Sequence, residues 1–81
     1  MVKIAICDDE RSVVDDIENH ILTYGKLNSV DLQIYKFYEG ETLVSSEIEF
    51  DIIFLDGQMT GMDGIETASL IRKKDMDIPI I

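Results

Sequence analysis

Short apolar runs alternate with amphipathic segments along this chain, and this alternation constrains the fold more than any other feature. The first apolar run covers residues 2–7, and from Arg11 to about Tyr24 apolar residues recur at helical spacing. Two more runs and two more helical segments follow before a last apolar run at residues 78–81. Strands separated by helices in this way pair in parallel, with helices on both faces of the sheet. The sequence therefore predicts an α/β fold with a doubly wound parallel sheet.

Glycine and the apolar spacing set the expected limits of the first helix and the second strand. Gly25 is expected to end the helix and to open a loop over residues 26–29. The inward face of the helix is expected to include Leu22. A second strand is expected at about residues 32–37, although polar residues interrupt its apolar pattern.

The remaining elements are expected to follow the same plan. A second helix begins at Gly40, a third strand covers residues 52–55, and a third helix runs from Gly64 to about Lys74. A fourth strand is expected at residues 78–81, with proline near its start. The residues expected to face inward from the second and third helices are Leu43, Val44, Ile48, Ile65, Ala68 and Ile71.

Composition narrows the function classes. The chain has 81 residues, 46% hydrophobic and 30% charged, as expected of one small globular domain rather than a disordered segment. A formal net charge of −10 disfavours direct contact of these residues with nucleic acid. The single cysteine, Cys7, lies in an apolar run, which excludes a disulfide framework and fits a reducing cytoplasm. No apolar stretch reaches transmembrane length, so we expect a cytoplasmic location without membrane contact.

The last apolar run ends at Ile81 with no helix to cover it. We therefore expect residues 1–81 to be the N-terminal part of a longer domain, with a sheet edge and part of the helix layer missing. An open apolar edge and a bare face of the first helix favour association between copies of this chain.

Acidic residues follow two of the predicted strands. Asp8 and Asp9 come directly after the first strand, and Asp56 follows the third. Because the carboxyl ends of parallel strands meet at one edge of a sheet, the three carboxylates are expected to converge. They repel one another unless a cation joins them, and Mg²⁺ with one or two carboxylates keeps sites for phosphate oxygens. The pattern predicts a magnesium and phosphate pocket in which Asp56 can act as a nucleophile.

Each acidic motif has an ordinary interpretation when it is taken alone. An Asp-Asp-Glu sequence usually forms a solvated turn or the start of a helix, where acids suit the helix dipole. A single Asp after an apolar run, such as Asp56, is usually a turn residue. The occurrence of both motifs, with glycines at positions 57, 61 and 64 shaping the loop after the second, favours a functional site.

Together these motifs resemble those of the receiver domain of two-component response regulators. Residues 6–10 match the acidic pair after the first strand of that family, and residues 54–64 match its phosphoacceptor strand and loop. The resemblance covers the whole chain. It implies a flavodoxin-like fold with strand order 2-1-3-4, in which the fifth strand and the last helices are missing from these residues. It also implies a sensor histidine kinase as the partner and Mg²⁺ as the cofactor.

The resemblance implies a role for each site residue. Asp56 would be the phosphoacceptor, and the protein would be a switch rather than a turnover enzyme. Asp9 would ligate Mg²⁺ directly, Asp8 mostly through water, and Gln58 through its backbone carbonyl. Thr60 stands where the family usually has proline, which is expected to loosen that turn. The Ser or Thr and the Lys that bind phosphate in the family fall after Ile81.

Residues 6–10 and 38–41, together with the long first helix, look most like regulators that carry a LytTR-type DNA-binding domain. This resemblance implies that the intact protein regulates transcription. Contact with DNA would then be made only through a separate output domain.

Two other functions are compatible with parts of the sequence. Residues 54–57 also resemble the nucleophile motif of haloacid-dehalogenase-like phosphatases. Those enzymes have a second acid two residues after the nucleophile, where this chain has Gln58, and the motif leaves Asp8 and Asp9 unexplained. The other alternative is an interaction module that dimerises without phosphorylation.

Overall fold

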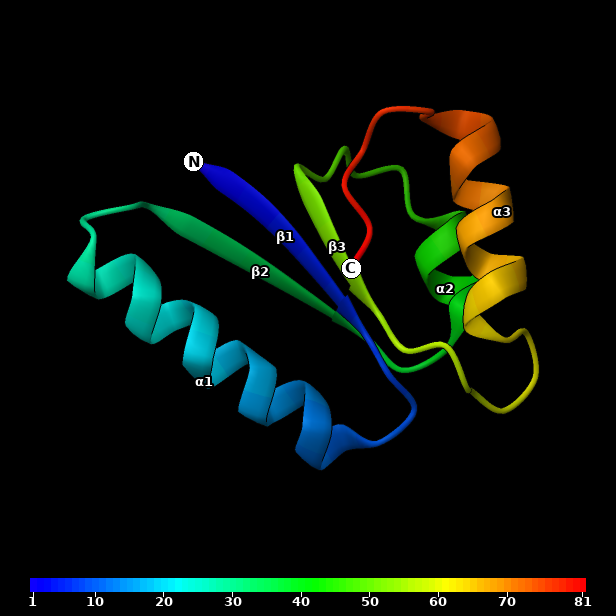
Figure 1. Ribbon diagram of the computed structural model, residues 1–81, viewed down its shortest axis with the longest axis horizontal. Helices are drawn as coiled ribbons and strands as arrows, with labels where there is room; N and C mark the ends of the chain where they lie inside the picture. Colours follow the sequence, from blue (N-terminus) through cyan, green and yellow to red (C-terminus); the bar gives the residue numbers. More distant parts are fainter.

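The computed structural model describes all 81 residues and contains a parallel three-stranded sheet with strand order β2-β1-β3. Helix α1 covers one face of this sheet, while α2 and α3 lie together on the other (Figure 1). The predicted doubly wound, flavodoxin-like α/β fold is confirmed. Its elements are β1 (Val2–Cys7), α1 (Arg11–Leu27), β2 (Leu32–Phe37), α2 (Gly40–Ser45), β3 (Ile52–Leu55) and α3 (Gly64–Lys74).

Strand β1 lies at the centre of the sheet and divides the core into two parts. Ala5 and Cys7 point toward α2 and α3, whereas Ile4 and Ile6 point toward α1. Because successive side chains of a strand face opposite sides, a strand covered on both faces needs a continuous apolar run. This explains why the first run lacks the polar alternation of a half-exposed strand. Its register with both neighbours brings the carboxyl ends of β1 and β3 to the same edge.

The predicted fourth strand is shorter than expected. Ile80 forms a single parallel bridge with Ile53, and Ile81 N–H donates to the Ile53 carbonyl at 2.8 Å. The N–H of Ile53 in turn donates to the Pro79 carbonyl at 2.9 Å. Since Pro79 has no N–H, it cannot donate a ladder bond of its own. The segment nevertheless lies beside β3 on the side away from β1, in agreement with the order 2-1-3-4.

The prediction that Gly25 ends the first helix is wrong. Helix α1 continues to Leu27, and Gly25 is buried inside it. A Cβ at Gly25 would lie 2.5 Å from Leu32 Cδ1, so the glycine permits close packing of α1 on β2. The chain turns instead at Ser29, which has a φ of 55°. Leu22, expected to face inward, is 46% exposed.

Two further residues expected to face inward lie at the surface. Helix α2 ends at Ser45, so Ile48 belongs to the following loop and is 40% exposed. Ile65 in α3 is 79% exposed. The start of α3 lies close to the end of β3, since a Cβ at Gly64 would lie 2.0 Å from the Asp56 carbonyl oxygen. Apolar spacing alone did not reveal which face of α3 is buried. The residues that α3 buries are Gly64, Thr67 and Ile71.

The surface carries one groove that is apolar throughout. It lies on the α1 face of the sheet and remains open to solvent. The groove is lined by Val2, Ile4, Ile21, Tyr24, Val30, Leu32, Ile52 and Phe54.

None of the helices has the length and apolar character that crossing a bilayer requires.

Candidate functional site

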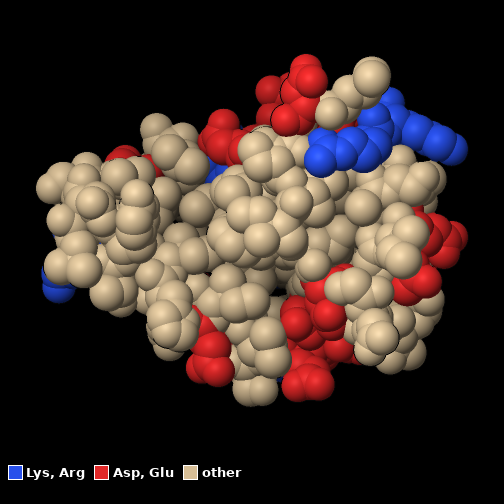
Figure 2. All heavy atoms as spheres, in the orientation of Figure 1, with Lys and Arg blue, Asp and Glu red and all other residues tan.

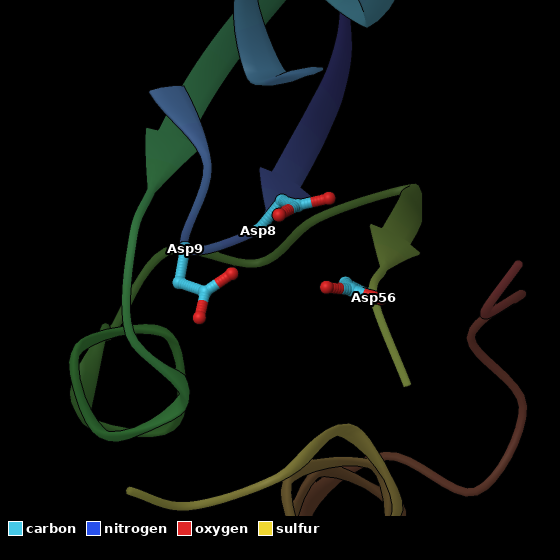
Figure 3. Close-up of side chains that lie close together, drawn as sticks. All are labelled: Asp8, Asp9 and Asp56. Carbon is cyan, nitrogen blue, oxygen red and sulfur yellow. The ribbon is translucent and has the colours of Figure 1, made fainter. Parts of the chain in front are cut away.

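Three aspartates meet where β1 and β3 end. The register pairs Cys7 with Leu55, so the residues that follow the two strands emerge side by side. The N–H of Asp56 donates to the Cys7 carbonyl at 3.0 Å, which extends the ladder by one bond beyond β3. Each of Asp8, Asp9 and Asp56 has a carboxylate oxygen within 4.8 Å of the others. Figure 3 shows the three carboxylates facing a common space.

Hydrogen bonds within the two turns fix Asp8 and Asp56. Asp8 Oδ1 accepts from the N–H of Glu10 at 2.9 Å, and Asp56 Oδ1 accepts from the N–H of Gln58 at 3.2 Å. Both are turns in which an aspartate binds the backbone two residues further on. No group of the chain donates to Oδ2 of Asp8 or to Oδ2 of Asp56, so these two oxygens are available to a ligand.

Asp9 is held from the other side of the site. Its Oδ2 accepts two hydrogen bonds from Thr60, one from the backbone N–H at 3.1 Å and one from the hydroxyl at 3.3 Å. Thr60 belongs to the loop between β3 and α3, four residues after Asp56. The two acidic turns are therefore joined by side-chain contacts as well as by the sheet.

The electrostatics of the cluster favour a cation. Burial raises the pKa of Asp8 above its usual value, and the charges of Asp56 and Asp9 raise it further, against a hydrogen bond from Glu10 that lowers it. The ion pairs in the structure join Lys36 to residues of α1, so no Lys or Arg side chain neutralises the cluster by direct contact. In Figure 2 acidic side chains lie below, near the ends of β1 and β3, and also along the top and the right edge, while most of the visible Lys and Arg atoms lie at the upper right, over the end of α3.

Cys7 lies directly beneath the cluster but is unsuited to chemistry there. It is buried, and its single S–H has two possible acceptors, the Glu39 carbonyl at 3.5 Å and Met59 Sδ at 3.7 Å. Burial raises its pKa to about 12, and the nearby charges of Asp8, Asp56 and Asp9 add to the effect. A thiol that stays protonated is neither a nucleophile nor a metal ligand at neutral pH. Cys7 is therefore a packing residue of the core.

Two glycines shape the loop after Asp56. Gly61 has a φ of +79°, a conformation that residues with a Cβ rarely adopt. A Cβ at Gly64 would lie 2.0 Å from the Asp56 carbonyl oxygen, so only glycine allows this approach. The side chain of Asp63 accepts from the N–H of Glu66 at 2.8 Å and caps α3. The expectation that glycines at positions 61 and 64 shape the loop after Asp56 is confirmed.

The structure leaves the role expected for Gln58 as it was but adds contacts for Thr60 that the sequence analysis did not predict. Gln58 lies in the Asp56 turn, where its N–H is used, and its carbonyl accepts no hydrogen bond within the chain. Its role as a metal ligand stays a prediction. Thr60 was expected only to loosen the turn, yet it supplies two donors to Asp9. A proline would supply neither, and this was the signal available in the sequence.

The fold and the site define a flavodoxin-like α/β domain with an acidic cluster at the carboxyl ends of its strands. Residues 4–81 match the sequence model of the response regulator receiver domain. The chain therefore belongs to the receiver domain family of response regulators, the regulatory partners in two-component signalling. This confirms the resemblance seen in the sequence.

Individual relatives agree with this assignment. The chain is 32% identical over 83 residues to the heme response regulator HssR of Staphylococcus haemolyticus, covering 100% of this chain and 34% of that protein. It is similar to the response regulator TrrA of Thermotoga maritima in complex with Mg²⁺-BeF, with a TM-score of 0.86 and 28% identity over 99% of this chain and 66% of that one. TrrA has also been solved in complex with the histidine kinase ThkA, and there the TM-score is 0.77 at 27% identity, with the same coverage.

Proposed function

We propose that Asp56 accepts a phosphoryl group from a sensor histidine kinase, with Mg²⁺ held by the acidic cluster. The observation that carries this proposal is the approach of the Asp8, Asp9 and Asp56 oxygens to within 4.8 Å of one another. Membership of the receiver family supports it. The Mg²⁺-BeF complex of TrrA and the complex of TrrA with ThkA support the choice of metal and of partner.

The donor set fits magnesium. Mg²⁺ prefers oxygen ligands and is usually bound by one or two carboxylates, with its other positions left to water and phosphate oxygens. In this proposal Asp9 ligates through the oxygen that no group of the chain occupies, and Asp56 ligates through Oδ1, which keeps one lone pair beside the N–H of Gln58. Asp8 ligates mostly through water, and Gln58 uses its free carbonyl. The bound ion would neutralise the carboxylates and the phosphoryl oxygens.

The proposed transfer uses the oxygen of Asp56 that has no hydrogen bond within the chain. This oxygen attacks phosphorus, and a new O–P bond forms while the N–P bond of the kinase phosphohistidine breaks. The electron pair of the broken bond stays on the histidine nitrogen. Gln58, two residues after Asp56, cannot act as a general acid or base. We therefore expect a lasting acyl phosphate and a switch, not rapid turnover.

The proposal extends to the intact protein. The chain spans about a third of the length of HssR. We propose that residues 1–81 are the N-terminal part of a receiver domain in a cytoplasmic protein. Its output would be a transcription domain, of LytTR type by the resemblance of residues 6–10 and 38–41, and DNA would be contacted only by that domain.

The 81-residue chain by itself is also expected to self-associate. The apolar groove on the α1 face is lined by hydrophobic side chains only, and Tyr24 within it is 63% exposed. Burying such a surface between two copies is favourable. Light scattering should show a concentration-dependent rise in mass, and a strictly monomeric, folded chain would refute this part of the proposal.

The test of the phosphoacceptor role is intact-mass measurement on the full-length protein incubated with Mg²⁺ and a small acyl phosphate. We expect one phosphoryl adduct in the wild type, lost in Asp56→Asn and without Mg²⁺. Asp16→Asn, which alters an exposed carboxylate on α1, is the matched control and should keep the adduct.

The same measurement separates the alternatives. Release of inorganic phosphate with many turnovers would favour the phosphatase. Neither adduct nor release would favour an interaction module that works without phosphorylation.

A further inference from the structure

We propose that Thr60 is a positioning residue for Asp9, and that its hydroxyl raises the affinity of the site for Mg²⁺. The inference rests on the proposed magnesium site and concerns a residue for which the family resemblance implied only a looser turn. Both donors of Thr60 bind the same oxygen, Asp9 Oδ2, at 3.1 Å from the backbone nitrogen and 3.3 Å from the hydroxyl.

The inference depends on a difference between the two Asp9 oxygens, of which only Oδ2 accepts hydrogen bonds. A carboxylate oxygen has two lone pairs, and Thr60 occupies both on Oδ2. No group of the chain donates to Oδ1, which leaves one oxygen of Asp9 for a metal ion. Figure 3 shows one Asp9 oxygen directed toward the other two carboxylates and one directed away. Hydrogen bonds from an outer group orient a ligand in this way and strengthen metal binding.

Apart from Thr60, few groups of the chain hold the Asp9 side chain in place. It is exposed, and the turn hydrogen bonds that hold Asp8 and Asp56 have no counterpart at Asp9. An unsupported aspartate on the surface samples several rotamers, and binding a metal must then restrict them. Thr60 imposes that restriction before the ion arrives.

The contact also joins two separate segments. Asp9 follows β1, while Thr60 lies in the β3–α3 loop that begins at Asp56. The hydroxyl therefore fixes the spacing between the Asp9 turn and the loop that carries the nucleophile. A proline at this position would fix the backbone of the loop but leave Asp9 without either donor.

The test is calorimetric titration with Mg²⁺ alone, which needs no phosphoryl donor. Thr60→Val keeps the branched shape and the backbone donor and removes only the hydroxyl. Thr60→Ser restores a hydroxyl, and Thr60→Ala provides a second hydroxyl-free variant. The matched control is Thr23→Val on α1, where the lost hydroxyl donates to the Asn19 carbonyl far from the site. Circular dichroism verifies that each variant is folded.

We expect Thr60→Val and Thr60→Ala to weaken Mg²⁺ binding by about tenfold, the lower end of the usual effect of losing an outer hydrogen bond. Thr60→Ser and Thr23→Val should bind as the wild type does. Equal or tighter binding by Thr60→Val would overturn the inference, because the hydroxyl would then be neutral or would compete with the ion. Failure of Thr60→Ser to restore affinity would also overturn it. Absence of Mg²⁺ binding by the wild type would instead refute the proposed magnesium site.

Discussion

The N–H of Asp56 donates to the carbonyl of Cys7, the last residue of β1, at 3.0 Å. Backbone pairing, rather than the acidic side chains themselves, therefore brings the two acidic turns together. The carboxylates repel one another, and the sheet holds them in place against that repulsion. This arrangement predicts that single charge-removing substitutions in the cluster leave the fold intact.

Gly64→Ala should be strongly destabilising. Its Cβ would lie 2.0 Å from the Asp56 carbonyl oxygen and 2.6 Å from Gly57 Cα, both backbone atoms that cannot move alone. We expect a loss of about 1–3 kcal/mol in the free energy of unfolding, the usual cost of forced overpacking. Gly57→Ala is the control in the same loop, since nothing lies within 4 Å of its Cβ position. Urea unfolding followed by circular dichroism measures both, and equal losses would contradict the role given to Gly64.

Asp8→Asn should stabilise the chain at neutral pH when divalent cations are absent. Because the folded-state pKa of Asp8 is raised, mainly by burial, the stability contributed by its protonated form is complete below about pH 3.8 and is lost as the pH rises through the raised value. The substitution removes this penalty, and the gain should be less than about 1 kcal/mol because the site is open to solvent.

Urea unfolding at pH 7 and at about pH 3 checks this prediction. The difference between Asp8→Asn and the wild type should shrink at the lower pH, where Asp8 is largely protonated. A variant less stable than the wild type at pH 7 without divalent cations would show that Asp8 is not under electrostatic strain.

Cys7 should be inert while the chain is folded. Its pKa is raised from 9.0 to about 12, so the thiolate fraction at pH 8 falls about a thousandfold. Thiol reagents attack the thiolate, and modification in native buffer should be slower than in denaturant by about that factor. The stability that this neutral thiol contributes is complete below pH 9 and is lost as the pH rises toward 12. Similar labelling rates with and without denaturant would refute the buried, protonated state.

Asp63→Ala should weaken the start of α3. The carboxylate accepts the N–H of Glu66 at 2.8 Å, and losing such a cap typically costs about 1 kcal/mol. Asp63→Ser, which keeps a capping oxygen, should restore most of the loss. Thermal unfolding of the three proteins measures the effect, and an unchanged alanine variant would show that the cap adds nothing.

The sequence predicted the element order, the parallel sheet and the convergence of three carboxylates. These features follow from apolar runs and from the common edge at which parallel strands end, and both are local or topological. The packing of individual residues between helices and strands was harder to predict from the sequence. Gly25 is buried against Leu32, and Ile65 is exposed while α3 buries Gly64 and Thr67. Neither arrangement leaves a periodic apolar pattern in the sequence.

The sequence likewise predicted some residues of the site but not others. Its acids lie at strand ends, where sequence patterns are informative. Thr60 reaches Asp9 across 51 positions of the chain, and only the loop geometry brings the two together. The presence of Thr60 where the family usually has proline marked the position as unusual, but it did not predict that Thr60 contacts Asp9.

The most direct test of the account uses beryllofluoride, an acyl-phosphate mimic, on the full-length protein, followed by ¹⁹F NMR. We predict a bound fluorine signal that requires Mg²⁺, disappears in Asp56→Asn and weakens in Asp9→Asn. A signal that persists in Asp56→Asn, or no bound signal at saturating Mg²⁺, would contradict the assignment of Asp56 as the phosphoacceptor of a magnesium-dependent receiver domain.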